Sequence, residues 1–391
     1  MKACLLATAA VVLAAPAFAD DLTINPWTTE LGALDVTVGG SAHGAVFANS
    51  MPSGAGAKQH WATGAADLNL KFERDYDSGL TLSLKSTFEV LRDRLSYDNY
   101  GGNLVAKVYG VAQTGLGRIE VGMTDGAAYA LSVTGPVVDD ITSIDNANTD
   151  FFIDPSTGRD FEELFALNSA VESSLNYAKI SYYTPRIFGL QLGVSYTPSE
   201  GREVIPFLNN GPNVANRQKS MWETAISYSQ TYGRTSLGFY GAATWGHGDR
   251  KTPGHAGLSE CGLGAEIDYD LNDDMKWSVG GAWRHANTYT FDIYDARSTG
   301  GTESSHLSTT LTYGPWIFGG EYGNGNADGG LLGPTLGLRG FEASVGYVIN
   351  ANFQLTAGWQ GLHYDRNLGT FYDGSRRIEM NAGFLHLRMH V

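Results

Sequence analysis

The sequence predicts an all-β fold: a 16-stranded antiparallel transmembrane β-barrel whose long third loop folds into the lumen. Three observations support this prediction. Short segments of alternating apolar and polar residues fill most of the chain, short turns and long loops alternate between them, and one stretch of fifty residues, 124–173, interrupts the alternation. Residues two apart lie on the same face of a strand, so the pattern indicates strands with one apolar and one polar face.

The first nineteen residues, 1–19, are predicted to be a signal peptide. Lys2 precedes a short apolar run, and Ala17 and Ala19 place small residues at the positions that signal peptidase reads. The run is too short to favour the alternative, a retained membrane helix. Cleavage would leave residues 20–391, which we expect to form a single barrel domain.

The composition excludes several classes of protein. Residues 20–391 carry 25 basic and 41 acidic side chains, a net charge of −16, whereas binding to nucleic acid requires Lys and Arg to meet the phosphates. We therefore expect no nucleic-acid partner. Cys261 is the single cysteine in this range, so no intrachain disulfide is expected. No apolar run beyond residue 19 reaches eighteen residues, so any membrane-spanning structure would have to be a barrel.

Sixteen segments carry the alternation, and each is predicted to be a strand. The first is typical, because Val36, Val38 and Ala42 fall on one face while Thr37 and Ser41 fall on the other. In chain order the predicted strands are 34–47, 67–73, 80–87, 104–109, 118–123, 175–184, 190–196, 222–229, 237–239, 263–269, 277–283, 307–313, 316–322, 341–347, 353–359 and 385–391.

The connections between these strands alternate in length. The short turns are at 75–79, 115, 187–189, 232–233, 272–274, 314–315 and 350–352. The longer polar loops are at 50–64, 93–103, 124–173, 199–221, 247–257, 288–304, 324–339 and 366–375. This order places every long loop at one end, as in outer-membrane barrels with short periplasmic turns. The alternative is a soluble two-sheet sandwich, but a chain of this length would then divide into domains, and no linker marks a boundary.

The third long loop, 124–173, is the most acidic part of the chain. Arg159 is its single base, and its acidic residues are Asp125, Asp139, Asp140, Asp145, Asp150, Asp154, Asp160, Glu162, Glu163 and Glu172. A loop of this length inside a regular architecture is usually functional. The alternative interpretation is a solvated external loop.

Four bases are predicted to face this loop across the barrel. Strand parity places them on the polar face of the second to fifth strands: Lys71, Lys85, Lys107 and Arg118. Sixteen strands leave an aqueous channel, so these bases would line it and form the basic side of a constriction. For the acidic side we predict Asp139, Asp140, Asp145 and Asp150. Two unit charges about 10 Å apart in water interact by only about 0.4 kcal/mol, so the sum of the charges would give a weak preference for cations.

Two motifs resemble the general, non-specific porins of Gram-negative bacteria, of the alphaproteobacterial type. The first motif is residues 117–127 (GRIEVGMTDGA), which lead into the long loop, and the second comprises 176–177 (NY), 180–185 (ISYYTP) and 188–196 (FGLQLGVSY). The resemblance extends over residues 20–391 in strand number and loop order. It implies that 124–173 folds into the barrel and narrows the pore. Members of this family usually end in Phe, which the insertion machinery reads, whereas this sequence ends in Val391.

The resemblance further implies a homotrimer in the outer membrane that passes ions and small hydrophilic solutes by diffusion. Small residues on the lipid-facing side of the first and fourth strands suit a subunit interface: Gly40, Ala42, Gly44, Ala106, Gly110 and Ala112. No Ser/His/acid set falls on adjacent strand ends, so we expect no enzyme. The alternatives are a substrate-selective channel, or a barrel whose external loops act in adhesion or catalysis.

We expect no cofactor. The acidic loops offer hard oxygen ligands, which makes a structural calcium ion a separate hypothesis. No EF-hand spacing is present, and the sequence assigns no metal ligands.

Overall fold

The structure is a computed structural model that describes residues 24–50, 60–91, 105–146, 167–199, 218–248, 257–287, 301–328, 335–367 and 377–391. The predicted signal peptide, 1–19, lies outside these ranges. The strands are β1 (Trp27–Leu31), β2 (Leu34–Asn49), β3 (His60–Asp75), β4 (Thr81–Leu91), β5 (Val105–Thr114), β6 (Gly117–Met123), β7 (Ala178–Tyr183), β8 (Leu190–Ser199), β9 (Lys219–Tyr232), β10 (Thr235–His247), β11 (Ser259–Asn272), β12 (Met275–Ala286), β13 (Thr302–Tyr313), β14 (Trp316–Asp328), β15 (Thr335–Val348), β16 (Phe353–Asn367) and β17 (Arg377–His390).

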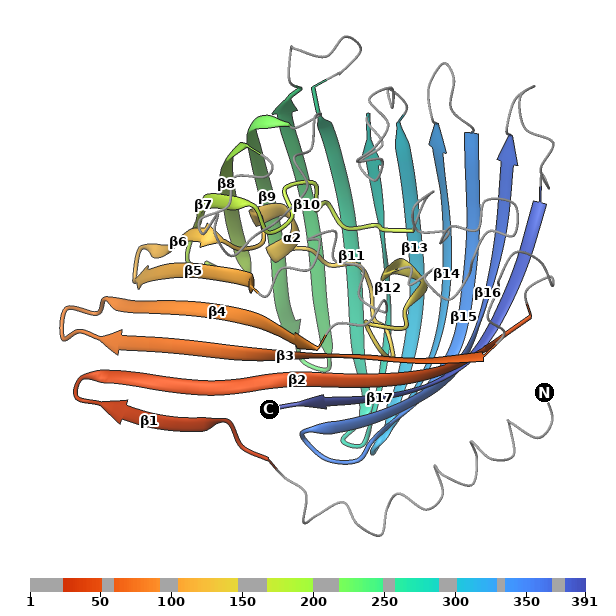
Figure 1. Cartoon of the computed structure of the whole chain (residues 1–391), viewed down its shortest axis with the longest axis horizontal. Helices are drawn as coiled ribbons and strands as arrows, with labels where there is room; N and C mark the ends of the chain where they lie inside the picture. The colour runs from red at the N-terminus through yellow and green to blue at the C-terminus, as the bar shows by residue number, and fades with distance from the viewer. Residues whose placement is uncertain are drawn as a thin grey trace.

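Strands β2 to β17 form a closed antiparallel barrel of sixteen strands (Figure 1). Each strand pairs with the next along the chain, and β17 pairs with β2 over Asn49 to Ser41, which closes the ring. Closure leaves no strand edge unpaired around the ring, so the ladders satisfy the backbone N–H and C=O groups. The predicted fold class, a 16-stranded antiparallel barrel, is confirmed.

Strand β1 is an addition that the alternation pattern did not predict. It forms a hairpin with β2 through Gly32, whose φ of 68° suits the tight turn. β1 pairs with Leu34 to Val38 of β2, on the edge that β17 uses further along. Val391 exchanges two backbone hydrogen bonds with Gly40 between these two pairings. The two ends of the described chain therefore meet at the barrel seam.

The strands also extend beyond the predicted boundaries at the long-loop end. β3 begins at His60 and β17 at Arg377, whereas we predicted 67 and 385. In the β17 extension the pattern is reversed, because Met380, Ala382 and Phe384 on the inner face are buried whereas Glu379 on the outer face is exposed. The backbone ladder nevertheless continues, because unpaired strand edges would leave backbone donors and acceptors without partners.

The two faces of the barrel have different chemistry. On β9, Trp222 and Ile226 are 50% and 48% exposed, whereas Glu223 and Ser227, each the next residue along the strand, are buried. The exposed apolar face is the outer face of the closed barrel, and the polar face is therefore the inner one. Within the described ranges, no helix has both the length and the apolar character needed to cross a membrane.

Candidate functional site

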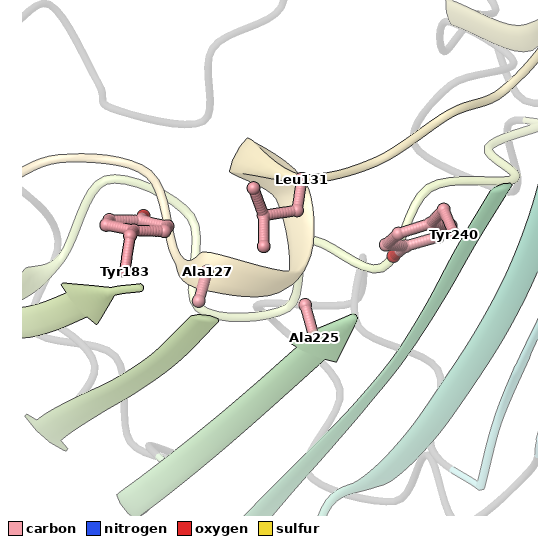
Figure 2. Close-up of a cluster of buried hydrophobic side chains, with 5 residues drawn as sticks. All are labelled: Ala127, Leu131, Tyr183, Ala225 and Tyr240. Atoms are coloured by element: carbon pink, nitrogen blue, oxygen red, sulfur yellow. The ribbon is translucent and has the colours of Figure 1, made fainter. Parts of the chain in front are cut away.

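The long segment after β6 begins with a short helix, α2 (Ala127–Ala130), seated on the inner face of the barrel. Ala127 and Leu131 pack in a buried apolar cluster with Tyr183, Ala225 and Tyr240, which belong to β7, β9 and β10 (Figure 2). Two polar contacts hold the start of the helix, because the N–H of Ala127 donates to Ser195 Oγ at 2.7 Å and that of Ala128 to Glu223 Oε2 at 3.4 Å. The wall thus supplies acceptors to N–H groups that a helix leaves unpaired at its first turn.

From α2 the segment runs along the inner face as far as the barrel seam. Its successive residues meet strands further along the ring. The carbonyl oxygen of Thr134 is 3.0 Å from Nδ1 of His306 on β13, and that of Val138 accepts from Gln354 on β16 at 2.8 Å. The side chain of Asp139 then reaches β17. This outward run therefore follows the wall from β8 to β17.

The segment then turns back along the same wall. We call its described residues here, 142–146 and 167–173, the return run. The carbonyl of Thr142 accepts a hydrogen bond from Gln360 on β16, and Ser143 donates to Glu321 Oε2 on β14 at 2.6 Å. A 3-10 turn, η2 (Ile144–Asn146), contacts β14 and β15. Where the described chain resumes, Leu167 lies near the backbone of β14 and β15, and Val171 near β11. The described contacts of the segment therefore run along the wall from β8 to β17 and then back from β16 to β11.

A hydrogen-bonded chain anchors the turning point at the seam. Nδ1 of the buried His386 lies 2.5 Å from Asp139 Oδ2, and its Nε2 lies 3.2 Å from Nδ1 of His43 on β2. Burial by itself would raise the pKa of Asp139, but the hydrogen bond and charge of His386, together with the hydrogen bonds from Ile141 and Thr356, outweigh burial and lower the pKa. One proton must lie between the two facing imidazole nitrogens, so the contact cannot persist if both rings are fully protonated.

The return run carries two acids, Asp145 and Glu172, whose pKa values are raised by burial. Asp145 accepts from the N–H and the hydroxyl of Ser169, at 2.9 and 2.6 Å, and burial raises its pKa. Glu172 accepts from the Asn168 amide, and burial raises its pKa to about 7. Both carboxyl groups are therefore hydrogen-bonded to residues of the segment itself.

The four predicted bases lie on four successive strands of the ring, β3 to β6. Lys71 on β3 is the cross-strand partner of Lys85 on β4, and Lys107 and Arg118 follow on β5 and β6. Lys71 pairs with Glu73 at 2.7 Å, and Lys107 with Asp125 at 2.7 Å. Lys85 has no ion pair within the described ranges. We call Lys71, Lys85, Lys107 and Arg118 the basic wall.

Arg118 is the most constrained member of the basic wall. Its Nε lies 3.0 Å from Glu120 Oε1, and its guanidinium carbon lies 4.4 Å from the centre of the Tyr183 ring. Tyr183 also packs against α2, so Arg118 connects the basic wall to the start of the segment. The base therefore has both an ion-pair partner and a cation–π partner.

The four predicted acids fall into three environments. Asp139 and Asp145 are engaged with the wall and with Ser169, as described above. Asp140 is the exposed member, with 62% of its side chain accessible and an ion pair to Arg388 Nη1 at 2.6 Å. Asp150 lies outside the described residues. Strand parity could not distinguish these environments, because it says nothing about a segment that has no strand.

Several residues that hold the segment had no signal in the sequence. Lys179 is 3% exposed and donates to the carbonyl oxygens of Thr124, Ser174 and Leu175. His386 reaches Asp139 across 247 positions of sequence. Parity could place both side chains on the inner face, but not their partners.

The calcium hypothesis is neither supported nor opposed by these contacts. Across the described ranges, no three His, Cys, Asp or Glu side chains group as a metal site. Five acids of the long loop lie outside those ranges: Asp150, Asp154, Asp160, Glu162 and Glu163.

Comparisons with known proteins agree with this architecture. A family model described as Gram-negative porin matches residues 6–360. A search of curated proteins found no match. Among solved structures, the outer membrane channel DcaP of Acinetobacter baumannii has a TM-score of 0.60 at 13% identity, covering 94% of this chain and 100% of that chain.

Two further solved structures are similar at the level of the fold. OmpT, an outer membrane protein of Vibrio cholerae, has a TM-score of 0.55 at 12% identity and covers 93% of this chain and 99% of its own. The anion-selective porin from Comamonas acidovorans has a TM-score of 0.51 at 12% identity, with coverages of 92% and 100%.

The closed barrel, its apolar outer face and its polar inner face define an outer-membrane channel protein. The match over residues 6–360 shows that the chain belongs to the Gram-negative porin family. Its location is therefore the outer membrane of a Gram-negative bacterium.

Proposed function

We propose that the protein is a passive, water-filled channel for ions and small hydrophilic solutes, with a weak preference for cations, and that it is not an enzyme. One observation carries the proposal: apart from Asp125, which pairs with Lys107, the described contacts of the segment after β6 are to β8–β17 and not to the basic wall. The passage then runs between the segment and β3–β6. The constriction is bounded by that segment, 124–173, and by Lys71, Lys85, Lys107 and Arg118.

Charge on the two sides of this passage supports only weak selectivity. Three members of the basic wall are paired with neighbouring carboxylates, and Asp140 is paired with Arg388. Each such pair presents a dipole to a passing ion. The inner face nevertheless keeps buried acids in excess, among them Glu223, Glu321 and Glu342. Cation preference would therefore come from the summed field.

Liposome swelling with sugars of graded size tests the channel directly. Swelling that slows steadily with sugar mass is expected for diffusion through a fixed opening. Reversal potentials in planar bilayers under a salt gradient then give the sign of the selectivity. A barrel that inserts in full but admits no sugar, or that admits one solute and excludes others of equal size, would contradict the proposal.

We also propose a homotrimer. The outer faces of β2 and β5 carry the small residues Gly44, Gly110 and Ala112, which allow another barrel to approach closely. A structure of OmpT of Vibrio cholerae is described as a trimer form, which is a statement about that protein. Light scattering of mildly extracted protein, corrected for detergent, tests the assembly. A particle of one chain mass would contradict it.

A further inference from the structure

Strands β8–β17, along which the segment lies, form what we call the covered wall. Its inner surface carries glycines where the segment lies against it. Strands β11, β12, β14 and β15 present glycines to the segment, and a Cβ built on any of them would meet a segment atom. We call this set the glycine seat: Gly262, Gly264, Gly280, Gly319, Gly323 and Gly346.

The outward run of the segment packs against three of these glycines, Gly264, Gly319 and Gly346, through Val133 and Val138. A Cβ on Gly264 would collide with the backbone carbonyl oxygen of Val133. Val138 is held between two strands, because a Cβ on Gly319 would collide with its Cγ2 and one on Gly346 would lie 2.9 Å from its Cγ1. Val is stiff at χ1, so Val138 cannot simply turn away.

The return run also packs apolar side chains against the glycine seat. A Cβ on Gly323 would lie 2.7 Å from Cδ1 of Leu167, and one on Gly262 would lie 2.7 Å from Cγ2 of Val171. Both Leu167 and Val171 are buried. The seat therefore receives apolar side chains of both runs, between the hydrogen bonds from His306, Gln354 and Gln360 described above.

The position of the seat on the ring gives it a consequence for the passage. In a ring of sixteen strands, β11 to β14 are eight strands away from β3 to β6. The seat therefore lies across the barrel from the basic wall. Any side chain added to the seat would push the segment away from the wall and toward Lys71, Lys85, Lys107 and Arg118.

We propose that the glycine seat sets the width of the passage, by letting the segment lie directly on the backbone of the barrel wall. The inference rests on the proposed function, since it assumes that the segment bounds the passage. β14 is held by ladders on both sides, whereas near Val138 the segment is held by side-chain contacts such as Gln354. The segment gives way first when the two are forced apart.

Gly319→Ala is the sharpest test, with Gly320→Ala as its matched control. The two glycines are neighbours on β14. At Gly319 the close contact is to Val138, whereas a Cβ on Gly320 would have a single neighbour, the Glu342 carbonyl oxygen, at 3.9 Å. We expect Gly319→Ala to reduce single-channel conductance and the size limit in liposome swelling, and to lower the unfolding midpoint in urea. Gly320→Ala should change none of these.

A double variant tests the contact between positions 319 and 138 directly. Val138→Ala removes the two γ-methyl groups that meet Gly319, so adding it to Gly319→Ala should restore most of the lost conductance and of the lost midpoint. Such non-additivity is expected for residues in contact. If Gly319→Ala fails to fold, Gly346→Ala replaces it, because its clash with Val138 is milder.

The outcomes separate the inference from the proposed function. Gly319→Ala could lower the urea midpoint, with rescue by Val138→Ala, and yet leave the conductance unchanged. That result would support the packing of the segment on the glycine seat but contradict the proposal that the segment narrows the passage. Equal conductance and equal midpoints for Gly319→Ala, Gly320→Ala and the unchanged chain would overturn the inference.

Discussion

The basic wall on β3–β6 and the covered wall on β8–β17 have the same alternating strand pattern but use their polar residues differently. On the basic wall, the side chains of Lys71 and Arg118 are 40% and 38% exposed. On the covered wall, Glu223 and His386 are almost completely buried and hold the segment. The inward bases Lys71 and Arg118 are therefore accessible on one wall, whereas the inward Glu223 and His386 are structural anchors on the other.

This contrast changes the interpretation of charge in the segment. Its acidity in the sequence suggested a row of carboxylates facing the passage. Asp139 and Asp145 are instead used in hydrogen bonds to His386 and Ser169. Among the three predicted acids that the structure describes, Asp140 has the most accessible side chain, at 62%, and we therefore propose that it is the one that acts on a passing ion.

Arg284→Met should be the most destabilising change on the covered wall. Arg284 and Glu260 form a buried ion pair on β12 and β11. Removing one partner leaves a buried charge uncompensated, so the free energy of unfolding should fall by about 3–5 kcal/mol. Urea titration of the refolded protein measures it. The control on the same strand is Lys276→Met, whose exposed pair with Asp268 should contribute about 0–1 kcal/mol. Similar losses for both would contradict the role assigned to burial of the Arg284–Glu260 pair on the covered wall.

His386→Ala should destabilise less, by about 1–3 kcal/mol, because Asp139 loses one hydrogen bond but keeps the N–H of Ile141. The folded-state pKa of Asp139 lies below its usual 3.8, so its contribution is present above that pH and is lost as the pH falls through the folded value. The difference between His386→Ala and the unchanged chain should therefore shrink below about pH 4. His363→Ala, in an exposed pair with Glu379, is the control. A difference that grows on acidification would contradict the assignment.

Glu172→Gln should stabilise the protein at neutral pH. Because burial raises the pKa of Glu172 from 4.5 to about 7, the folded state holds a proton that the unfolded state has released, and stability falls as the pH rises through that window. Gln resembles the protonated form, so the gain should appear between pH 4.5 and 7 and reach on the order of 1–2 kcal/mol after allowance for partial exposure. Urea titrations at several pH values measure it, with Glu379→Gln as the exposed control. A gain that is the same at pH 4 and pH 8 would argue against it.

Asp140→Asn and Lys85→Gln should shift selectivity in opposite directions with little effect on stability. Asp140→Asn should weaken the cation preference and Lys85→Gln should strengthen it. One charge at about 10 Å in water contributes about 0.4 kcal/mol, which corresponds to a factor of about two in permeability ratio. Reversal potentials measure the shifts. Glu379→Gln, on the outer face, should leave them unchanged. Shifts of the same sign for Asp140→Asn and Lys85→Gln would contradict the proposed passage.

Much of the barrel followed from local pattern alone. Alternation located sixteen strands, and the order of short and long connections predicted closure. The parity rule also placed Lys71, Lys85, Lys107 and Arg118 on adjacent inward positions, where the structure has them. It missed β1, because five residues are too few for a period to stand out and because its place on β2 depends on where β17 ends.

The segment could not be placed in this way, because its contacts join residues far apart in the chain. Gln354 and Val138 are separated by 216 positions, and Gln360 and Thr142 by 218. Nothing local in either partner specifies the other. The glycine seat is a similar case, since glycine in a strand reads from sequence as a weak point or a bulge and acquires its meaning only from what lies against it.

Periodicity predicted the barrel, its two faces and the strands that carry the bases, because a strand repeats every two residues and every ladder of the ring except the closing one, β17 with β2, pairs neighbours in the chain. Which inward residues are covered depends on tertiary contacts. That outcome depends on the path of one segment across strands remote in sequence, and on steric fit at Gly264 and Gly319, which no periodicity encodes.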